Sequence, residues 1–544
     1  MSQLVPVEQV GQVGIIKDTP TYSLPPNAFS DGLNVRFVDN GVEKLDGYLE
    51  VMKDCPIYPQ HLVFVNQDEK DYWIVFGNNV PITRASVNLA IQLYNPSDSQ
   101  WYNLTPINGI QVQSADVWSA EWNGRILYAT YGGLENLYWP MGTDNKFDIT
   151  KKFKSFTPKS PTNEDRKFIS MYSFKSHVIG LGVNYPDYSN PYMVQWSTPM
   201  GTYEEPTAGK WDLLDDTLDA GEYELNETKG VIVGGRQLGD SFMVYKEDCV
   251  YVMNYIGPPF MFGFKVMAKD IGMLSRNGID VFDGGHVFIG NNNVYLNNGQ
   301  NIIPLLSDKL QSEMFDDISG DNYFRAFVVA DKLNTEMLIA WPSHSSRHCD
   351  RGIIWNWRTG TMSLRDLPNI DHACEGVVNL TQGEKWDDTF GEWDTRIDKW
   401  GERSYFNVLQ ELVFAGYGDK KMYRSGTGNK ADTENMYSVI ERTGYDLGDP
   451  GSVKFVRAVW PKISVSGSNT VNVSVCSQMS PDDPLNWEGP YQYNPDMQSK
   501  VSCRVTGKYF GIKVESEGDF TWRLHGYEFD MDQAGRRGVM NYAV

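Results

Sequence analysis

The feature that most constrains the fold is a loose repeat of short apolar segments separated by turns of glycine, asparagine and aspartate. It starts near residue 60 and recurs roughly every 40 to 60 residues, a spacing typical of propeller blades and their loops. Residues 72–77, 241–245 and 336–341 are examples of these segments. Runs rich in β-branched and aromatic residues between such turns predict short antiparallel strands.

The composition agrees with strands rather than helices. Aromatic residues make up 13% of the chain, and there are 50 glycines. Rings fit a pleated surface and glycine supplies the positive φ of tight turns. We therefore predict an all-β fold, a β-propeller with a C-terminal β-sandwich-like domain. A pair of stacked sandwiches is the alternative that the same pattern allows.

The pattern changes near residue 436. Segments 453–460, 471–476 and 509–515 alternate cleanly between apolar and polar residues, as strands with one solvated face do. We expect an N-terminal segment (1–58) that contributes a strand to the propeller, a propeller with inserted loops (59–435), and a β-sandwich with an extended tail (436–544). The early strand at 33–37 is expected to close a blade, since a circular array needs a latch.

The net charge of the chain limits the classes of partner that it can bind. The formal net charge is −22 and the pI is about 4.8. Sequence-independent binding to nucleic acid needs clustered cations, and so does adhesion to an anionic membrane. The charge is compatible with a surface that DNA slides past, and equally with simple solubility.

Cysteine usage and the N-terminus indicate an intracellular setting. Six cysteines are spread thinly and no Cys-x-x-Cys occurs, so no disulfide framework is expected. We see no signal peptide and no apolar run long enough to span a bilayer. We expect the protein to be made and used in the cytoplasm, or built into a particle there, without membrane integration.

No catalytic motif stands out. A Gly-x-Ser-x-Gly elbow, a P-loop, a Gly-x-Gly-x-x-Gly that opens a helix, a His-Glu-x-x-His and an EF-hand loop are all absent from the sequence. A carboxylate pair of the glycosidase type could be hidden among the many acids. We expect a protein that is not an enzyme and needs no cofactor.

Histidines and cysteines gather in two predicted loops, one after the strand that ends at Trp341 and one after the strand that ends near Arg365. If these strands alternate in direction, both loops emerge on the same face and could hold a metal ion with soft ligands. Their spacing matches no standard zinc module, so ordinary packed residues are the alternative. The candidate ligands are His344, His348, Cys349, His372 and Cys374.

Two insertions interrupt the repeat. Residues 203–227 are strongly acidic and form either a solvated loop or a surface that faces a lumen or a partner. The acidic candidates are Asp212, Asp215, Asp216, Asp219 and Glu222. Trp386, Trp393 and Trp400 follow one another at seven-residue steps. They either pack on a blade or stack against a glycan.

Several segments resemble known virion proteins. Residues 23–37 and 41–47 read SLPPNAFSDGLNVRF and GVEKLDG, similar to the N-terminal signature of many phage virion proteins. Residues 230–253, 270–275 and 285–295 read GVIVGGRQLGDSFMVYKEDCVYVM, DIGMLS and GHVFIGNNNVY. They resemble the propeller core of the packaged-DNA stabilisation proteins, or tail nozzle proteins, of short-tailed bacteriophages (podoviruses).

The resemblance covers about half the chain, and neither the acidic insertion nor the histidine and cysteine loops match it. It implies a hexameric ring below the portal and adaptor proteins, in the phage tail of a virion assembled in the host cytoplasm. The ring would extend the DNA channel, retain packaged DNA without binding it specifically, and anchor tail needle or fibre proteins.

Two other functions stay open. The chain could be a carbohydrate-binding or glycan-degrading propeller of the tail, for which the three tryptophans would supply stacking faces. It could also be a host scaffold propeller that binds peptides.

Overall fold

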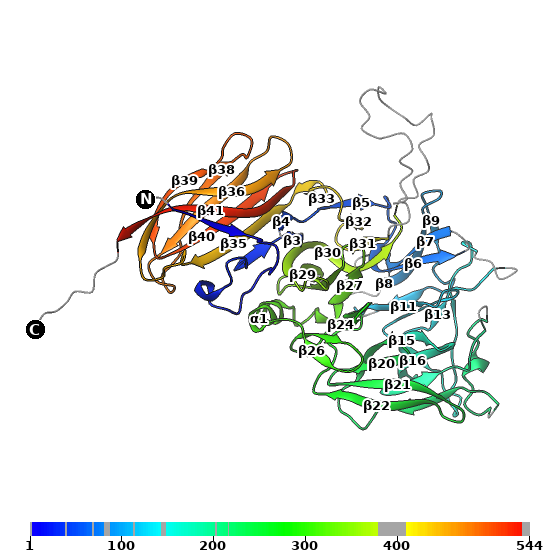
Figure 1. The fold of residues 1–544 in the computed structure, drawn as a ribbon. Coiled ribbons are helices and arrows are strands. Elements are labelled where there is room, and N and C mark those ends of the chain that lie inside the picture. Colours follow the sequence, from blue (N-terminus) through cyan, green and yellow to red (C-terminus); the bar gives the residue numbers. More distant parts are fainter. Residues whose placement is uncertain are drawn as a thin grey trace, which may run out of the picture.

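A computed structural model describes residues 3–535 except 39–40, 68–69, 81–86, 113–114, 143–147, 202–203, 216 and 379–409. Within these residues the chain is almost entirely strands and turns, as the sequence predicts (Figure 1). The one α-helix of the described part is α1 (Asp308–Asp317). No helix in that part is long and apolar enough to cross a membrane.

Five antiparallel sheets follow one another along the chain. In each, consecutive strands pair with their sequence neighbours, apart from β9 and β10, which both pair with β8. The sheets are β6 (Tyr58–Gln67), β7 (Lys70–Asn78), β8 (Val87–Asn95), β9 (Gln100–Asn103) and β10 (Ile110–Val112); β11 (Trp118–Trp122), β12 (Leu127–Tyr131), β13 (Leu137–Tyr138) and β14 (Lys154–Ser155); β15 (Lys167–Phe174), β16 (His177–Asn184), β17 (Ser189–Trp196) and β18 (Gly221–Glu224); β19 (Ile232–Leu238), β20 (Ser241–Lys246), β21 (Cys249–Gly257) and β22 (Met261–Lys269); and β23 (Ile279–Phe282), β24 (Gly285–Ile289), β25 (Val294–Asn297) and β26 (Ile302–Pro304).

A larger sheet continues the series. Its ladder runs through β27 (Phe327–Asp331), β28 (Glu336–Trp341), β29 (Cys349–Asn356), β30 (Met362–Gly376), β31 (Glu411–Gly416), β32 (Lys421–Ser425) and β5 (Tyr48–Val51), with β33 (Lys430–Ala431) and β34 (Glu434–Asn435) beyond it. The strand β30 belongs to two groups. Its first part pairs with β29, and its last part, from Ile370 to Gly376, pairs with β31.

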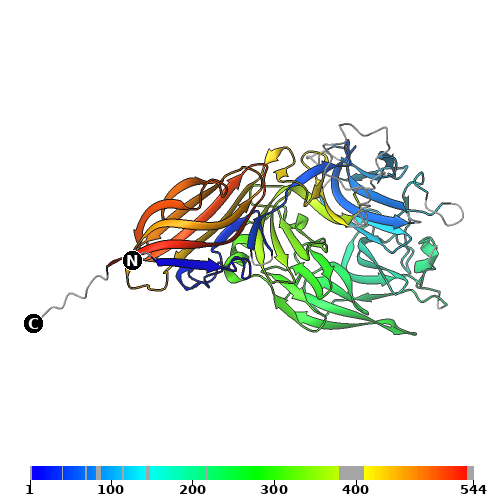
Figure 2. The same ribbon diagram turned by 45° about the horizontal axis from the view of Figure 1, so that its top comes forward.

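The first strands of these groups touch in cyclic order. The strand β6 contacts β11, and contacts continue through β15, β19, β23 and β27 to β30, which contacts β6. These contacts follow one another in a cyclic series, and Figures 1 and 2 show the sheets arranged around a common centre. The apolar segments supply the layers between sheets, because strands such as β7 are buried on both faces.

The closing strand comes from the N-terminal segment, but it is β5 and not residues 33–37. The strand β5 pairs antiparallel with β32. The expected strand is broken at Asn34, which has a φ of 54°. Asn34 separates β2 (Asp31–Leu33) from β3 (Val35–Val38), and Val35 and Phe37 are buried in the C-terminal part of the molecule.

Two sheets enclose one apolar core in the C-terminal part. One continues the larger sheet, because β2 pairs with both β30 and β35; it contains β2, β35 (Tyr437–Tyr445), β40 (Tyr509–Glu517), β37 (Val471–Gln478) and β38 (Asn486–Tyr493). The other contains β1 (Gln3–Glu8), β3, β4 (Gly41–Lys44), β36 (Val453–Val465), β39 (Val501–Gly507) and β41 (Trp522–Gly535). Burial alternates strictly along β39, as the sequence pattern predicts. Trp522 and Tyr527 are the largest side chains of this core.

A buried ion pair joins the N-terminal segment to the serial sheets. The Arg36 guanidinium contacts the Glu336 carboxylate through Nε to Oε1 at 2.8 Å and Nη2 to Oε2 at 3.0 Å. Only 12% and 6% of the two side chains are exposed. Burial raises the pKa of Glu336 and Arg36 opposes this rise. The Glu336 side chain therefore needs Arg36 beside it to stay ionised.

We predict that Arg36→Ala lowers the free energy of unfolding by about 3–5 kcal/mol, because it leaves a buried carboxylate without a cation. Urea denaturation followed by circular dichroism measures the change. The matched control is Arg351→Ala, which breaks an Arg351–Asp366 pair whose side chains are each 47% exposed. That change should cost no more than about 1 kcal/mol. Equal losses in the two variants would contradict the prediction.

Candidate functional site

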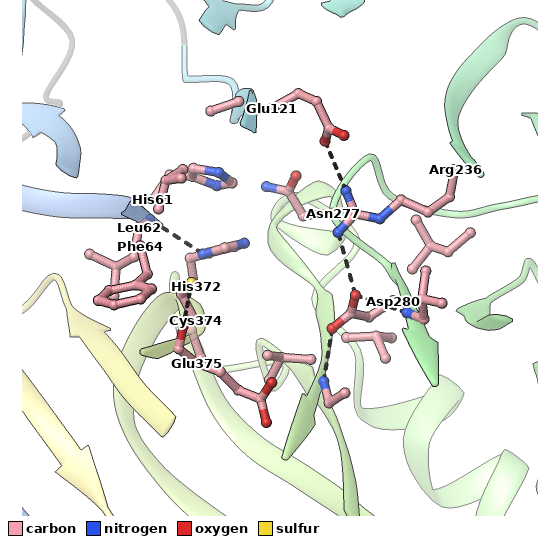
Figure 3. A pocket seen from close by; sticks show the side chains of 18 of the residues that line it. His61, Leu62, Phe64, Glu121, Arg236, Asn277, Asp280, His372, Cys374 and Glu375 are labelled. Atoms are coloured by element: carbon pink, nitrogen blue, oxygen red, sulfur yellow. Dashed lines mark hydrogen bonds and ion pairs between the residues drawn. The ribbon is translucent and has the colours of Figure 1, made fainter. Parts of the chain in front are cut away.

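A cavity of about 640 Å³ lies where the first strands of the serial sheets meet. Its wall is built from residues of β6, β11, β15, β19, β23, β27 and β30, so every group around the centre contributes (Figure 3). The volume is within the range of about 300–1,000 Å³ that small-molecule sites occupy. The cavity exists because the array is closed, and it is the candidate functional site of the described chain.

Arg236 is the central charge of the cavity. Its Nη1 lies 3.2 Å from Oε2 of Glu121 and its Nη2 lies 3.4 Å from Oδ1 of Asp280. The backbone N–H of Ala330 donates to the other Asp280 oxygen at 2.9 Å, which fixes that carboxylate. The side chains of Glu121, Arg236 and Asp280 are 24%, 34% and 22% exposed, and all three face the cavity in Figure 3.

The surrounding protein shifts the pKa values of Glu121 and Arg236. Burial raises the pKa of Glu121, Arg236 lowers it, and Asp280 raises it further. Burial alone would lower the pKa of Arg236, but Glu121 and Asp280 outweigh it, and the net shift is upward. The guanidinium therefore stays charged and the Glu121 carboxyl takes up a proton more readily than an ordinary glutamate.

Two histidines lie against each other on the opposite wall, with their rings tilted by 34°. The rings of His61 and His372 have centroids 3.8 Å apart. The backbone N–H of Leu62 donates to Nδ1 of His372 at 3.3 Å, which places the His372 proton on Nε2. His61 is 5% exposed and, among the described residues, its Nδ1 has no hydrogen-bond partner.

Both histidines are neutral at physiological pH. Burial lowers the pKa of His61 to about 3, with a further lowering from Arg236. Burial also lowers the pKa of His372 well below its usual value, and His61 and Arg236 add to this. Neutral imidazoles can donate one hydrogen bond and accept another, so the pair can serve as a polar wall without a charge.

The other cations of the cavity are paired as well. Arg276 lies 3.1 Å from Asp116 and Lys332 lies 3.0 Å from Glu375. The Lys332 backbone N–H also donates to Glu375. Each cation in the cavity wall therefore has a carboxylate partner.

The structure does not bring the five predicted metal ligands together. The described residues contain no group of three or more His, Cys, Asp or Glu side chains that could hold a metal ion, and all five candidate ligands are described. His348 contacts Asp371 at 2.6 Å, Cys349 donates to the carbonyl of Arg325, and His344 is exposed. His372 and Cys374 lie on β30 inside the cavity wall and not on a loop, because β30 continues past Arg365 to Gly376.

The described acidic candidates lie on the edge strand β18 of the third sheet or in the segment that precedes it, and none of them lines the cavity. Asp212, Asp215, Asp219 and Glu222 are exposed, and Asp216 is outside the described residues. Glu222 belongs to the edge strand β18 and pairs with Arg166. Asp212 and Asp215 accept backbone N–H groups two residues further on, from Leu214 and Thr217. The three tryptophans Trp386, Trp393 and Trp400 also lie outside the described residues.

Sequence motifs did not identify Glu121, Arg236, Asp280 or His61. One signal was present, since each is a polar residue within the apolar first strand of its group. Such a residue is costly in a core unless it is paired or faces a cavity. A search for polar residues in the first strand of every repeat would have identified these four residues.

The comparisons with known proteins give only distant similarity. No family model and no curated protein matches the chain. Among solved structures, a glycoside hydrolase is 10% identical, covering 87% of this chain and 98% of its own, with a TM-score of 0.26. The WD40 domain of Neurospora crassa Pan2 is 8% identical, covering 71% and 96%, with a TM-score of 0.34. The extracellular domain of a hybrid two component system from B. thetaiotaomicron is 10% identical, covering 61% and 40%, with a TM-score of 0.29.

We predict that the buried histidines make the fold sensitive to acid. His61 has a pKa of about 3 in the folded chain against 6.5 when solvated. Stability is therefore fully present above pH 6.5 and is lost as pH falls toward 3, at about 1.4 kcal/mol per pH unit for each such group. Between pH 6 and pH 4, His61→Phe should reduce the slope of the unfolding free energy against pH by about 1.4 kcal/mol per pH unit.

Urea denaturation of both proteins at a series of pH values measures this difference. His344→Phe is the matched control, because His344 is an exposed loop residue. Parallel pH profiles for the unmodified chain and His61→Phe would show that His61 is not buried in its neutral form.

Proposed function

We propose that the chain is a structural, non-enzymatic subunit of the tail of a short-tailed bacteriophage, in the role of a tail nozzle protein. In this proposal the serial sheets form a seven-bladed β-propeller and the two C-terminal sheets form a β-sandwich. The cyclic contacts of the first strands, the closing strand β5 and the central cavity support the propeller. The shared core of the two C-terminal sheets supports the sandwich.

The observation that carries the assembly role is an apolar hairpin tip between β21 and β22. Tyr255, Ile256 and Phe260 are 47%, 58% and 72% exposed, and all three lie at or beside the turn that joins β21 to β22 in the fourth sheet (Figure 1). Exposed apolar groups that lie together mark surfaces that another protein covers. The resemblance of residues 230–253 to tail nozzle proteins falls on this same sheet.

The cavity itself is not the DNA channel of the proposed ring. A volume of about 640 Å³ equals a cube with edges of about 8.6 Å, whereas the major groove of duplex DNA alone is about 12 Å wide. The ion pairs of Arg236 also cross this space. The channel must therefore lie between subunits, where the net charge of −22 would keep DNA from adhering.

Electron microscopy and mass photometry of the purified full-length chain test the proposal. The expected result is a ring of subunits, hexameric if the resemblance holds, around an open channel. Incorporation of the tagged chain into phage particles at the portal-proximal tail is the second expected result. A chain that stays monomeric at all concentrations and never joins phage particles would refute the proposal.

We predict that Ile256→Ser with Phe260→Ser weakens assembly at least tenfold, because anchors of this kind contribute more than about 1.4 kcal/mol each to an interface. Analytical ultracentrifugation measures the association constant. Ile107→Ser is the matched control, since Ile107 is 87% exposed but lies outside the hairpin. Assembly that survives the double substitution, or fails equally in the control, argues against the hairpin as the contact.

A further inference from the structure

The cavity wall offers hydrogen-bonding groups that the protein does not use. Nδ1 of the buried His61 and Nε of Arg276 have no partner among the described residues. His372 accepts the Leu62 N–H through Nδ1, so its Nε2 carries a proton for a further acceptor. An unpaired buried polar group costs free energy. A ligand or ordered water that pairs with these atoms would recover that free energy.

Polar side chains on two walls of the cavity face one space. Figure 3 shows His61 and His372 pointing from one wall toward Asn277, Glu121 and Arg236 on the other. They come from β6, β30, β11, β19 and the segment before β23. Since these strands belong to different groups of the array, their relative positions are fixed by the closure of the whole ring.

The charges of the wall favour a neutral occupant. Arg236 is paired with Glu121 and Asp280, Arg276 with Asp116, and Lys332 with Glu375. An anion would have to compete with these carboxylates for the cations, and a cation would have to compete for the carboxylates. The histidine pair adds no charge. A neutral polar molecule enters without breaking an ion pair.

The wall also carries apolar and aromatic faces. Phe64, Trp122 and Phe282 line the cavity beside the polar groups. Aromatic rings pack against the C–H faces of a sugar ring, while sugar hydroxyl groups both donate and accept hydrogen bonds. This combination matches a wall that carries both donors (His372, Arg276) and acceptors (Glu121, Glu375).

We propose that the central cavity is a binding site for a neutral saccharide of one or two rings. Its hydroxyl groups would pair with His61, His372 and Glu121, and its ring would pack against the aromatic wall. The site is separate from the apolar hairpin and does not depend on the tail assignment, so either proposal can fail alone. It would give the chain a glycan-recognition function in addition to assembly.

Isothermal titration calorimetry of the full-length chain tests the site. The probes are the neutral sugars glucose, galactose, mannose, N-acetylglucosamine, maltose and lactose, with glucuronate, sialic acid and adenosine as chemical contrasts. The expected result is saturable binding of at least one neutral sugar at one site per chain, with no binding of the anionic sugars or the nucleoside. Absence of binding by every neutral sugar, or tighter binding of an anionic sugar or of adenosine, would overturn the proposal.

Two substitutions locate the bound sugar. His61→Phe keeps the stacked ring but removes both nitrogens, and Glu121→Gln removes the carboxylate charge, so each should weaken binding about tenfold or more. His344→Phe, on an exposed loop, should bind as the unmodified chain does. Because a substitution could also disturb folding, each variant is compared by circular dichroism, and saturation-transfer NMR identifies the bound sugar on the unmodified chain. Unchanged affinity in both folded variants would place the sugar elsewhere and refute the site.

Discussion

Closure of the circular array is the constraint on which the rest of the structure depends. An open series of sheets would expose the edge of β32 and leave the first and last groups without neighbours. The pairing of β5 with β32 covers that edge with a strand from near the N-terminus, and β30 meets β6 at the same junction. Exposed strand edges invite pairing with other chains. The pairing of β5 with β32 therefore protects the monomer from association through this edge, and it also stabilises the arrangement of the sheets. This pairing costs conformational entropy, because β5 and β32 lie far apart in the sequence and a long segment of chain must be closed into a loop.

The cavity follows from the same closure. Side chains on the first strands cannot fill the centre completely, and polar residues there are tolerated because they are paired or face the open space. Arg236 shows how this works, since it joins Glu121 and Asp280 from two other groups. Buried ion pairs are weak sources of net stability. Their value here is geometric, because each pair holds one strand at a set position relative to the next.

Much of the fold could be predicted from the sequence, and the limits have identifiable causes. Alternation and turn residues predicted the strands, and the N-terminal strand was expected because a circular array of sheets needs a closing strand. The strand at 33–37 was wrong because Asn34 adopts a left-handed conformation, which apolar periodicity does not reveal. The predicted strand that corresponds to β30 ended near Arg365. In the structure β30 continues, because a register shift near Ile370 lets it pass from one partner strand to the next. The site was missed because Arg236 meets partners 115 and 44 residues away, and no local pattern records such distances.

The two surfaces proposed to bind partners are separated by the sheets themselves. The apolar tip lies at the end of β21 and β22, whereas the cavity is lined by β19 of that same sheet, with β20 between them. A four-stranded antiparallel sheet whose middle strands are buried, as β20 is, does not deform continuously under a contact at its edge. An assembly through the outer hairpin, as proposed, would therefore leave the spacing of His61, Glu121 and Arg236 unchanged, because contacts among the first strands set that spacing. A chain built in this way can be fixed in an assembly by its periphery and still keep a preformed site at its centre.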